Sequence, residues 1–116
     1  MWEIEYTDEF EDWWDTLSEK EQKAVAVGVK ALEGAGPALK FPHSSSIQSS
    51  KHGNMRELRG QCEGRPLRTF YAFDPGRVAV LLIGGDKTGN DRFYDEFVPL
   101  ADRIYDQYLK EIKENK

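Results

Sequence analysis

An apolar run at residues 78–83, Val-Ala-Val-Leu-Leu-Ile, limits the possible folds of this chain more than any other segment. Successive side chains of a strand point to opposite faces, so a strand that is apolar throughout must be covered on both faces. The run therefore predicts a central strand, at 77–83, in a sheet covered by helices. Asp74-Pro75-Gly76 directly before it is a turn sequence, because Pro presets φ and Gly accepts a positive φ.

The other strand and helix signals surround this run. Alternating apolar and polar residues predict a strand at 2–6, and further strands are predicted at 54–60 and 67–73. Thr7 is a suitable N-cap for a first helix, which carries an aromatic stripe at helical spacing. The sequence Ser-Glu-Lys-Glu from Ser18 is a capping box, so a second helix begins there. The stripe consists of Phe10, Trp13, Trp14 and Leu17.

The ends of the helices complete the prediction. The second helix is expected to stop at Gly34 and to be followed by a long surface loop at 34–53, which is rich in Gly, Ser and Pro. A C-terminal helix begins near Phe93, and Pro99 is expected to kink it, break it or begin a new segment. The order β-α-α-β-β-β-α predicts one α+β domain over residues 1–116, in which a small sheet is packed by a helical hairpin and a C-terminal helix.

Charge and composition exclude several classes of protein. The net charge is −5 and the pI is about 5.1, which argues against a non-specific nucleic-acid-binding protein. The charge is uneven, because residues 1–34 carry ten acids and three bases whereas residues 35–73 carry six bases and two acids. One cysteine, Cys62, excludes an internal disulfide, and it is expected to be an exposed bystander thiol. Without a membrane-spanning run or a signal peptide, the chain is expected to be cytoplasmic.

The junction at residues 84–94 is the strongest local indication of function. It combines two glycines, Lys87, Arg92 and Tyr94 between a strand and a helix, a set that suits an anion such as phosphate. The segment is not a P-loop, because Asp86 stands where that motif requires Gly before the Lys. Other candidates are weaker. The serine-rich loop with His43 lacks support as a hydrolase site, and a lone His52 beside a loop is commonly without function.

Basic residues on the predicted strands extend this junction. Arg56, Arg59 and Arg68 lie on strands whose ends fold back beside Lys87 and Tyr94 in an antiparallel meander. Cleavage of RNA by its own 2′-hydroxyl needs a base, an acid and cations that neutralise the charge developing on phosphorus, and it needs no metal. The alternative is that these cations form a solvated strand face. The aromatic stripe, by its spacing, is expected to be core, with one tryptophan free to face a partner.

Three sequence blocks carry a resemblance that covers nearly the whole chain. They are Met-Arg-Glu-Leu-Arg at 55–59, Gly-Arg-Pro-Leu-Arg-Thr-Phe-Tyr-Ala-Phe at 64–73, and Leu-Leu-Ile-Gly-Gly-Asp-Lys-Thr-Gly at 81–89 followed by Arg-Phe-Tyr at 92–94. In this order they resemble the phage-derived HigB-type toxins of the RelE/ParE superfamily. The resemblance implies a RelE-like, antiparallel-rich sheet and a toxin of a type II toxin–antitoxin pair.

The resemblance also implies partners and roles. Enzymatic members cut mRNA on the ribosome, and a cognate helix-turn-helix antitoxin neutralises them; no cofactor, metal or membrane is involved. By the same resemblance Arg68 is the phosphate clamp, Lys87 a second cation or the acid, and Tyr94 the base or a stacking partner. The residues expected to position RNA are Arg56, Arg59 and Arg92.

Two other functions remain open at this stage. The chain could be a non-enzymatic, ParE-like inhibitor of DNA gyrase, although such a protein does not need the set of Lys87, Arg92 and Tyr94. It could also be a degenerate module that only binds its antitoxin. The net charge of −5 differs from the strongly basic character of ribosome-dependent nucleases in this superfamily.

Overall fold

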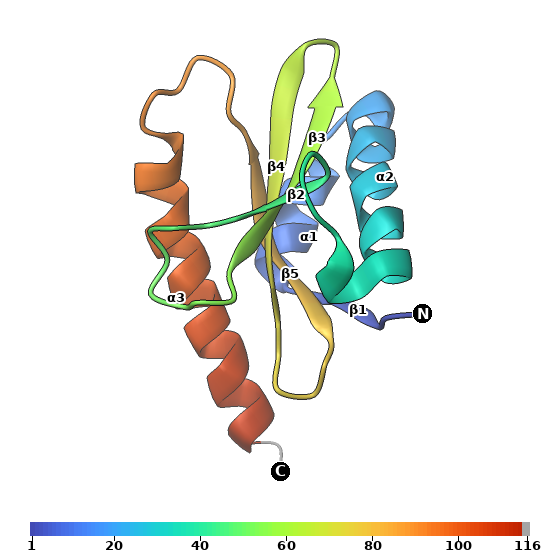
Figure 1. Cartoon of the computed structure of the whole chain (residues 1–116). Helices are drawn as coiled ribbons and strands as arrows, with labels where there is room; N and C mark the ends of the chain where they lie inside the picture. Colours follow the sequence, from blue (N-terminus) through green and yellow to red (C-terminus); the bar gives the residue numbers. More distant parts are fainter. Residues whose placement is uncertain (115–116) are drawn as a thin grey trace.

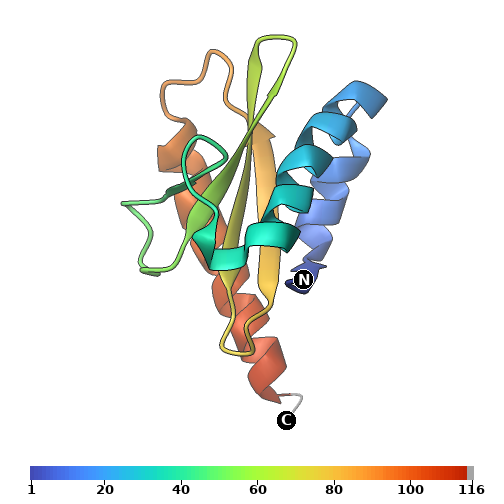
Figure 2. The ribbon, with the colours of Figure 1, turned by 45° about the vertical axis from the view of Figure 1, so that its right-hand side comes forward.

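The computed structural model describes residues 1–114 as three layers, with a five-stranded sheet between a helical hairpin and one long helix (Figure 1). Figure 2 shows the hairpin on one side of the sheet and the long helix on the other. The predicted α+β class and order are confirmed. The elements are β1 (Ile4–Tyr6), α1 (Asp8–Asp15), α2 (Glu19–Ala35), a 3-10 turn η1 (Gly36–Ala38), β2 (Ser44–Ser46), β3 (Arg56–Cys62), β4 (Arg65–Phe73), β5 (Ala79–Asp86) and α3 (Phe93–Glu114).

The strand predicted from the apolar run lies inside the sheet, whose order is β1-β5-β4-β3-β2. Its residues 79–82 are at most 3% exposed, so both faces are covered as predicted. Strands β2 to β5 pair antiparallel, whereas β1 pairs parallel with β5 and makes the sheet mixed. The strand also runs three residues beyond its predicted end, through Gly84 and Gly85 to Asp86.

Both N-terminal helices begin where their caps predict. The Thr7 hydroxyl accepts the Phe10 N–H at 3.1 Å, and the Ser18 capping box is complete, with both reciprocal hydrogen bonds present. The predicted end at Gly34 is wrong by one residue, since α2 continues to Ala35. Gly36 follows with a φ of 55°, and the Trp2 indole occupies the space that a side chain would need there.

The segment 34–53 was expected to be a long surface loop, and this prediction is wrong in part. It contains η1 and the short strand β2, which pairs with β3 at the edge of the sheet. Cys62 also differs from its predicted exposure, because it is 7% exposed within the core beneath the hairpin. Pro99 lies inside a continuous α3, so it neither ends the helix nor begins a new one.

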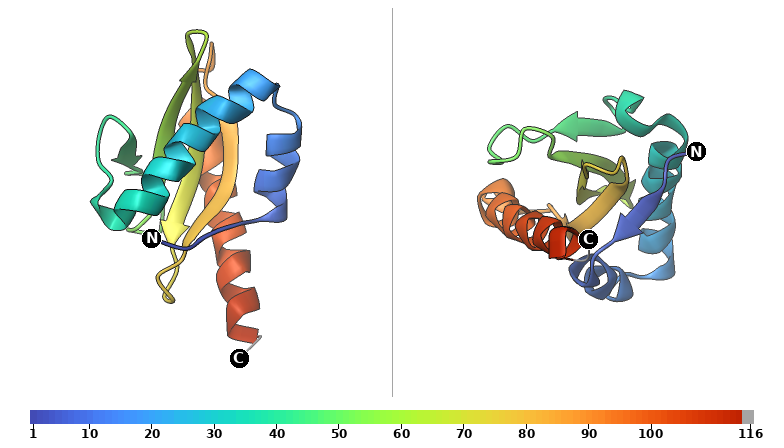
Figure 3. Two further views of the ribbon diagram at one scale, coloured as in Figure 1. Left: turned by 90° about the vertical axis from the view of Figure 1, so that its right-hand side faces the viewer. Right: turned by 90° about the horizontal axis from the view of Figure 1, so that it is seen from below.

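Each face of the sheet has its own apolar core. Seen from below in Figure 3, α3 covers one face and the hairpin covers the other. The α3 face packs Phe70 against Phe93 and Phe97, with ring centroids 5.9 and 6.2 Å apart. The hairpin face contains Phe10, Leu32, Leu58 and Leu81, among others. Within residues 1–114, no helix is long and apolar enough to cross a membrane.

Candidate active site

The register of β3 and β4 places three charged residues on the face that α3 covers. Glu57 lies opposite Phe70, and Arg59 lies opposite Arg68. Directly paired residues share a face of the sheet. Because Phe70 packs against α3, the side chains of Glu57, Arg59 and Arg68 all belong to that side.

Glu57 is the centre of the cluster. It is 4% exposed, and both of its carboxylate oxygens accept hydrogen bonds. Oε1 accepts from the Tyr94 hydroxyl at 2.8 Å, and Oε2 accepts from the Ser45 hydroxyl at 2.7 Å. A carboxylate this deeply buried is stable only with hydrogen-bond donors and a counter-charge. Tyr94 and Ser45 supply the donors, and arginines supply the charge.

Arg68 is the buried counter-charge, at 6% exposed. Its Nη1 donates to the main-chain oxygens of Gly60 and Leu67 at 3.2 and 3.3 Å. Its Nε makes no hydrogen bond within the described residues 1–114 and lies 3.6 Å from Glu57 Oε1. Buried polar atoms normally have partners, so this nitrogen is an unused donor directed towards the carboxylate.

Two further cations lie at the rim of the cluster. Nη1 of Arg59 is 3.8 Å from Glu57 Oε2, and this side chain is 30% exposed. Nζ of Lys87 lies over the Tyr94 ring, 5.0 Å from its centroid, a cation–π arrangement. The structure therefore brings together Arg68, Lys87 and Tyr94, the three predicted catalytic residues, with Arg59 beside them.

The environment of Tyr94 keeps its phenol protonated. Burial raises the pKa of Tyr94, and the hydrogen bond to Glu57 with the negative charge of that residue raises it further; Arg68 opposes these effects only in part. A phenol with a raised pKa is a proton donor at neutral pH and a poor base. In this geometry the phenol hydrogen is held by Oε1 of Glu57.

The other two predicted RNA-binding residues lie apart from the cluster. Arg56 is paired with Tyr71 on the opposite face of the sheet, and its Nε donates to the Ser44 hydroxyl at 3.0 Å. Arg92 lies at the surface with a side chain that is 80% exposed, and its Nε is 3.9 Å from Asp95.

Gly84 and Gly85 serve packing, in contrast to the phosphate-binding loop that the sequence suggests. Both belong to β5. A Cβ on Gly84 would overlap the Trp13 indole, and a Cβ on Gly85 would lie 2.7 Å from the Phe97 ring. The two glycines let helices on opposite faces approach the same strand.

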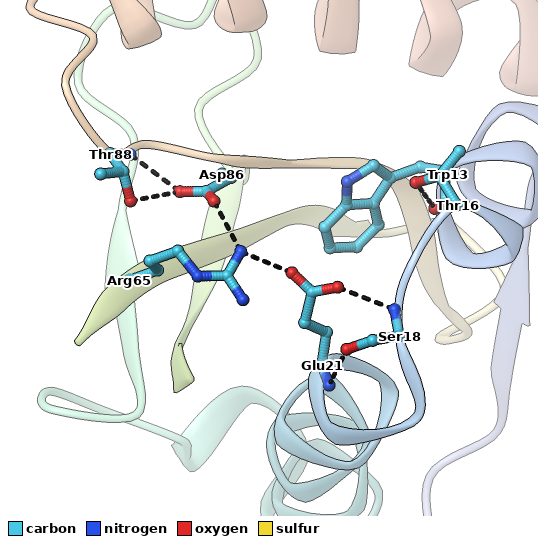
Figure 4. A network of polar contacts seen from close by, with 7 residues as sticks. All are labelled: Trp13, Thr16, Ser18, Glu21, Arg65, Asp86 and Thr88. Carbon is cyan, nitrogen blue, oxygen red and sulfur yellow. Dashed lines mark hydrogen bonds and ion pairs between the residues drawn. The ribbon is translucent and has the colours of Figure 1, made fainter. Parts of the chain in front are cut away.

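An ion-pair network fixes the loop that carries Lys87 (Figure 4). Arg65 Nη1 donates to Glu21 at 2.6 Å and to Asp86 at 3.2 Å, which joins α2 to the end of β5. Asp86 in turn accepts the Thr88 N–H at 2.9 Å. Burial raises the pKa of Asp86, but the hydrogen bonds from Thr88 and Arg65 outweigh it and lower that pKa. Lys87 is thus held between two anchored neighbours.

Sequence reasoning missed Glu57 and Ser45. Glu57 is an acidic residue between Arg56 and Arg59 on a strand, and its spacing of two from Arg59 places both side chains on one face. That spacing was the available signal for Glu57. Ser45 gave none, because its role depends on the pairing of β2 with β3.

The hairpin side carries an apolar groove of about 560 Å³ on the face opposite the cluster. Trp14 lines it and, like Trp13, is half-buried; that one tryptophan faces a partner stays a prediction. The groove also contains Ile4, Tyr6, Phe10, Val29 and Leu81, with Glu11, Asp15, Lys30 and Glu33 as its charged residues. Within the described residues, no group of three or more His, Cys, Asp or Glu side chains is arranged to hold a metal ion.

Comparison with known families identifies the domain. Residues 12–106 match the family described as phage derived protein Gp49-like (DUF891). The chain belongs to this family. The fold is also similar to that of E. coli toxin RelE, solved in the free state as a double arginine-to-alanine variant, with a TM-score of 0.60 and 7% identity. That likeness covers 83% of this chain and 94% of the RelE chain, and it concerns the fold alone.

Two candidate toxins of Mycobacterium tuberculosis (strain ATCC 25618 / H37Rv) are similar to this Gp49-like chain in sequence. HigB2 is 35% identical over 106 residues, which are 90% of this chain and 53% of HigB2. HigB3 is 39% identical over 100 residues, which are 85% of this chain and 86% of HigB3. The chain thus spans about half the length of HigB2. The predicted resemblance to phage-derived HigB-type and RelE-like proteins is confirmed.

Proposed function

We propose that this Gp49-like domain is the toxin of a type II toxin–antitoxin pair and that it cleaves mRNA on the ribosome. One observation carries the proposal: Arg68, Lys87 and Tyr94 gather with Arg59 around the buried carboxylate of Glu57. The similarity to HigB2 and HigB3 supports the toxin assignment. A cognate helix-turn-helix antitoxin would neutralise it in the cytoplasm.

The reaction is an attack of the RNA 2′-oxygen on the neighbouring phosphorus. A 2′,3′-cyclic phosphate forms, the bond to the 5′-oxygen breaks, and that oxygen takes up a proton. Glu57 is the group able to accept the 2′ proton, because the phenol of Tyr94 has a raised pKa. Tyr94 or Lys87 supplies the proton to the leaving oxygen, while Arg68 and Lys87 stabilise the charge on phosphorus. The step uses side chains only, with no metal or cofactor.

A second candidate function is favoured by the burial of Arg68. Its guanidinium already bonds two main-chain oxygens and faces Glu57, so a phosphate reaches Nε only if that carboxylate moves. A cluster that is closed in this way would also suit a module that binds its antitoxin without cutting RNA.

The deciding experiment is induced expression with transcript 5′ ends mapped and protein synthesis followed. The test variant is Lys87→Ala/Tyr94→Phe, which keeps Arg68 and Glu57 but removes the hydrogen bond from Tyr94 to Glu57. The matched control is Arg103→Ala/Lys110→Ala, which removes exposed cations elsewhere on α3. Cleavage within translated codons by wild type and control, but not by the test variant, is the expected result.

Two other outcomes reject the nuclease. Growth arrest with intact mRNA points instead to a non-enzymatic inhibitor, for which DNA gyrase supercoiling is the next assay. A soluble, folded chain that causes no arrest supports the antitoxin-binding module.

A further inference from the structure

Phe41 is an unusual surface residue. It is 70% exposed, one of the few large apolar side chains in residues 1–114 that remain in water. It lies at the tip of a turn in which the Lys40 carbonyl accepts the N–H groups of His43 and Ser44 at 3.0 and 3.1 Å. A single exposed apolar side chain is common on protein surfaces, so the interest of this ring lies in its neighbours rather than in its exposure.

The ring is joined to the candidate active site through Arg59. The guanidinium carbon of Arg59 lies 5.1 Å above the centroid of the Phe41 ring, and Nη1 of the same residue is 3.8 Å from Glu57. The Arg59 N–H also donates to the His43 carbonyl at 2.9 Å, which fixes the turn to β3. Phe41 is therefore one side chain away from Glu57, and its position is set before any ligand arrives.

We propose that Phe41 and Arg59 form a stacking platform for an unpaired nucleobase of the RNA cut at Glu57. Aromatic rings and guanidinium planes are the surfaces on which proteins stack the bases of single-stranded RNA. Lys40 and His43, both exposed beside the ring, lie within reach of the adjoining phosphates. The platform deepens the proposed nuclease function and rests on it for the identity of the ligand as RNA.

A protein partner is the other occupant that an exposed phenylalanine could have. The nucleobase is favoured because the ring lies beside Lys40 and in cation–π contact with Arg59, whereas the apolar groove lies on the opposite side of the sheet. A single ring with cationic neighbours suits one flat base attached to a phosphate chain.

The test compares Phe41→Leu with Phe41→Trp. Leucine keeps the apolar bulk but has no flat aromatic face, whereas tryptophan has a larger flat face than phenylalanine. The matched control is Tyr6→Leu, which removes a 59% exposed aromatic ring from the hairpin side. Purified proteins are titrated with a short 2′-O-methyl oligoribonucleotide, which cannot be cleaved, and with versions carrying one abasic position at successive sites along the strand.

The expected result is a coupling between the ring and one base. An abasic site at one position weakens binding by wild type, Phe41→Trp and Tyr6→Leu about 5-fold or more, which is the loss of affinity expected when one stacked base is removed. The same change weakens binding by Phe41→Leu less than about 2-fold. In a cell-free translation reaction, Phe41→Leu should also lose base preference at one nucleotide beside the cut.

Binding that ignores the abasic site in wild type, or no binding of the oligonucleotide, overturns the platform. So does a Phe41→Leu variant that cuts mRNA with unchanged rate and base preference, a result that leaves the nuclease intact. Conversely, ring–base coupling without any cleavage of mRNA rejects the nuclease and leaves Phe41 as a binding site for an RNA base that is not cut. A Phe41→Leu variant that loses only its association with the antitoxin assigns the ring to a protein partner and refutes the proposal.

Discussion

Replacement of Glu57 by Gln should destabilise the domain strongly, although the two side chains have almost the same shape. The carboxylate accepts two hydrogen bonds, from Tyr94 and Ser45, and faces the buried guanidinium of Arg68 at 3.6 Å. Gln keeps one acceptor oxygen and adds two N–H donors, so one hydrogen bond is lost or must reverse. Arg68 then remains buried without a counter-charge.

The magnitude follows from these contacts. A hydrogen bond to a charged group contributes about 1.5–3 kcal/mol, and removing one partner of a buried ion pair costs about 3–5 kcal/mol. These effects belong to the same carboxylate and are not summed, so we expect a loss of about 3 kcal/mol. With a urea m-value of about 1.5 kcal/mol/M, the unfolding midpoint should fall by about 2 M.

Urea unfolding followed by far-ultraviolet circular dichroism measures this loss. Glu19→Gln is the control, because Glu19 is 86% exposed and its carboxylate lies 3.7 Å from Lys23, which is 76% exposed. Such a surface pair contributes about 0.3–0.5 kcal/mol. The free energy of unfolding of the control should lie within about 0.5 kcal/mol of that of wild type. If the free energy of unfolding of Glu57→Gln does so too, Glu57 is not the anchor of the cluster.

Three smaller changes test other parts of the structure. Gly84→Ala should lower the free energy of unfolding in urea by about 1–3 kcal/mol, because its Cβ would overlap the Trp13 indole. The double variant Gly84→Ala/Trp13→Ala should lose less stability than the sum of the two single variants. The pKa of Glu21 lies below its ordinary value of 4.5 because it accepts the N-cap backbone N–H and then a side-chain bond from an arginine. Its stabilisation is therefore complete above about pH 4.5 and is lost as the pH falls through the folded pKa, so Glu21→Gln should show a shallower loss of stability on acidification. In Glu57→Gln the pKa of Tyr94 should fall, because burial still raises it but the carboxylate no longer does. Alkaline titration of tyrosine absorbance measures this, with Tyr94→Phe as the reference that identifies the Tyr94 signal. The same Tyr94 pKa in wild type and in Glu57→Gln would contradict the prediction.

Local sequence signals predicted most elements of the fold because they depend on neighbours along the chain. The caps at Thr7 and Ser18 and the apolar run of β5 are of this kind. Strand β2 could not be found in this way, since three serines become a strand only by pairing with β3. Gly84 and Gly85 were misread as part of a loop because the rings that require them come from distant helices.

The candidate site was predictable only in part for a similar reason. The sequence named Arg68, Lys87 and Tyr94, and the fold brings them together. It also grouped Arg56 with Arg59, although a spacing of three along a strand places two side chains on opposite faces. That error was avoidable. The central place of Glu57 could not be predicted from the sequence, because it arises from the register of β3 with β4 and from the position of α3.

The distribution of charge bears on whether an acidic chain could bind RNA as proposed. The acids of residues 1–34 belong mainly to the hairpin, which the sheet separates from the face that carries Glu57 and Arg68. Solvent-exposed charges farther apart than about 8 Å are largely screened at physiological salt, and the domain is 26 Å across at its thinnest, so acids on the outer surface of the hairpin repel a strand on the other face only weakly. The cluster itself offers few cations, and one of them, Arg68, is already paired with Glu57. Charge alone therefore gives this site little affinity for RNA. The proposed nuclease therefore needs contacts that salt does not weaken, such as a base stacked on Phe41.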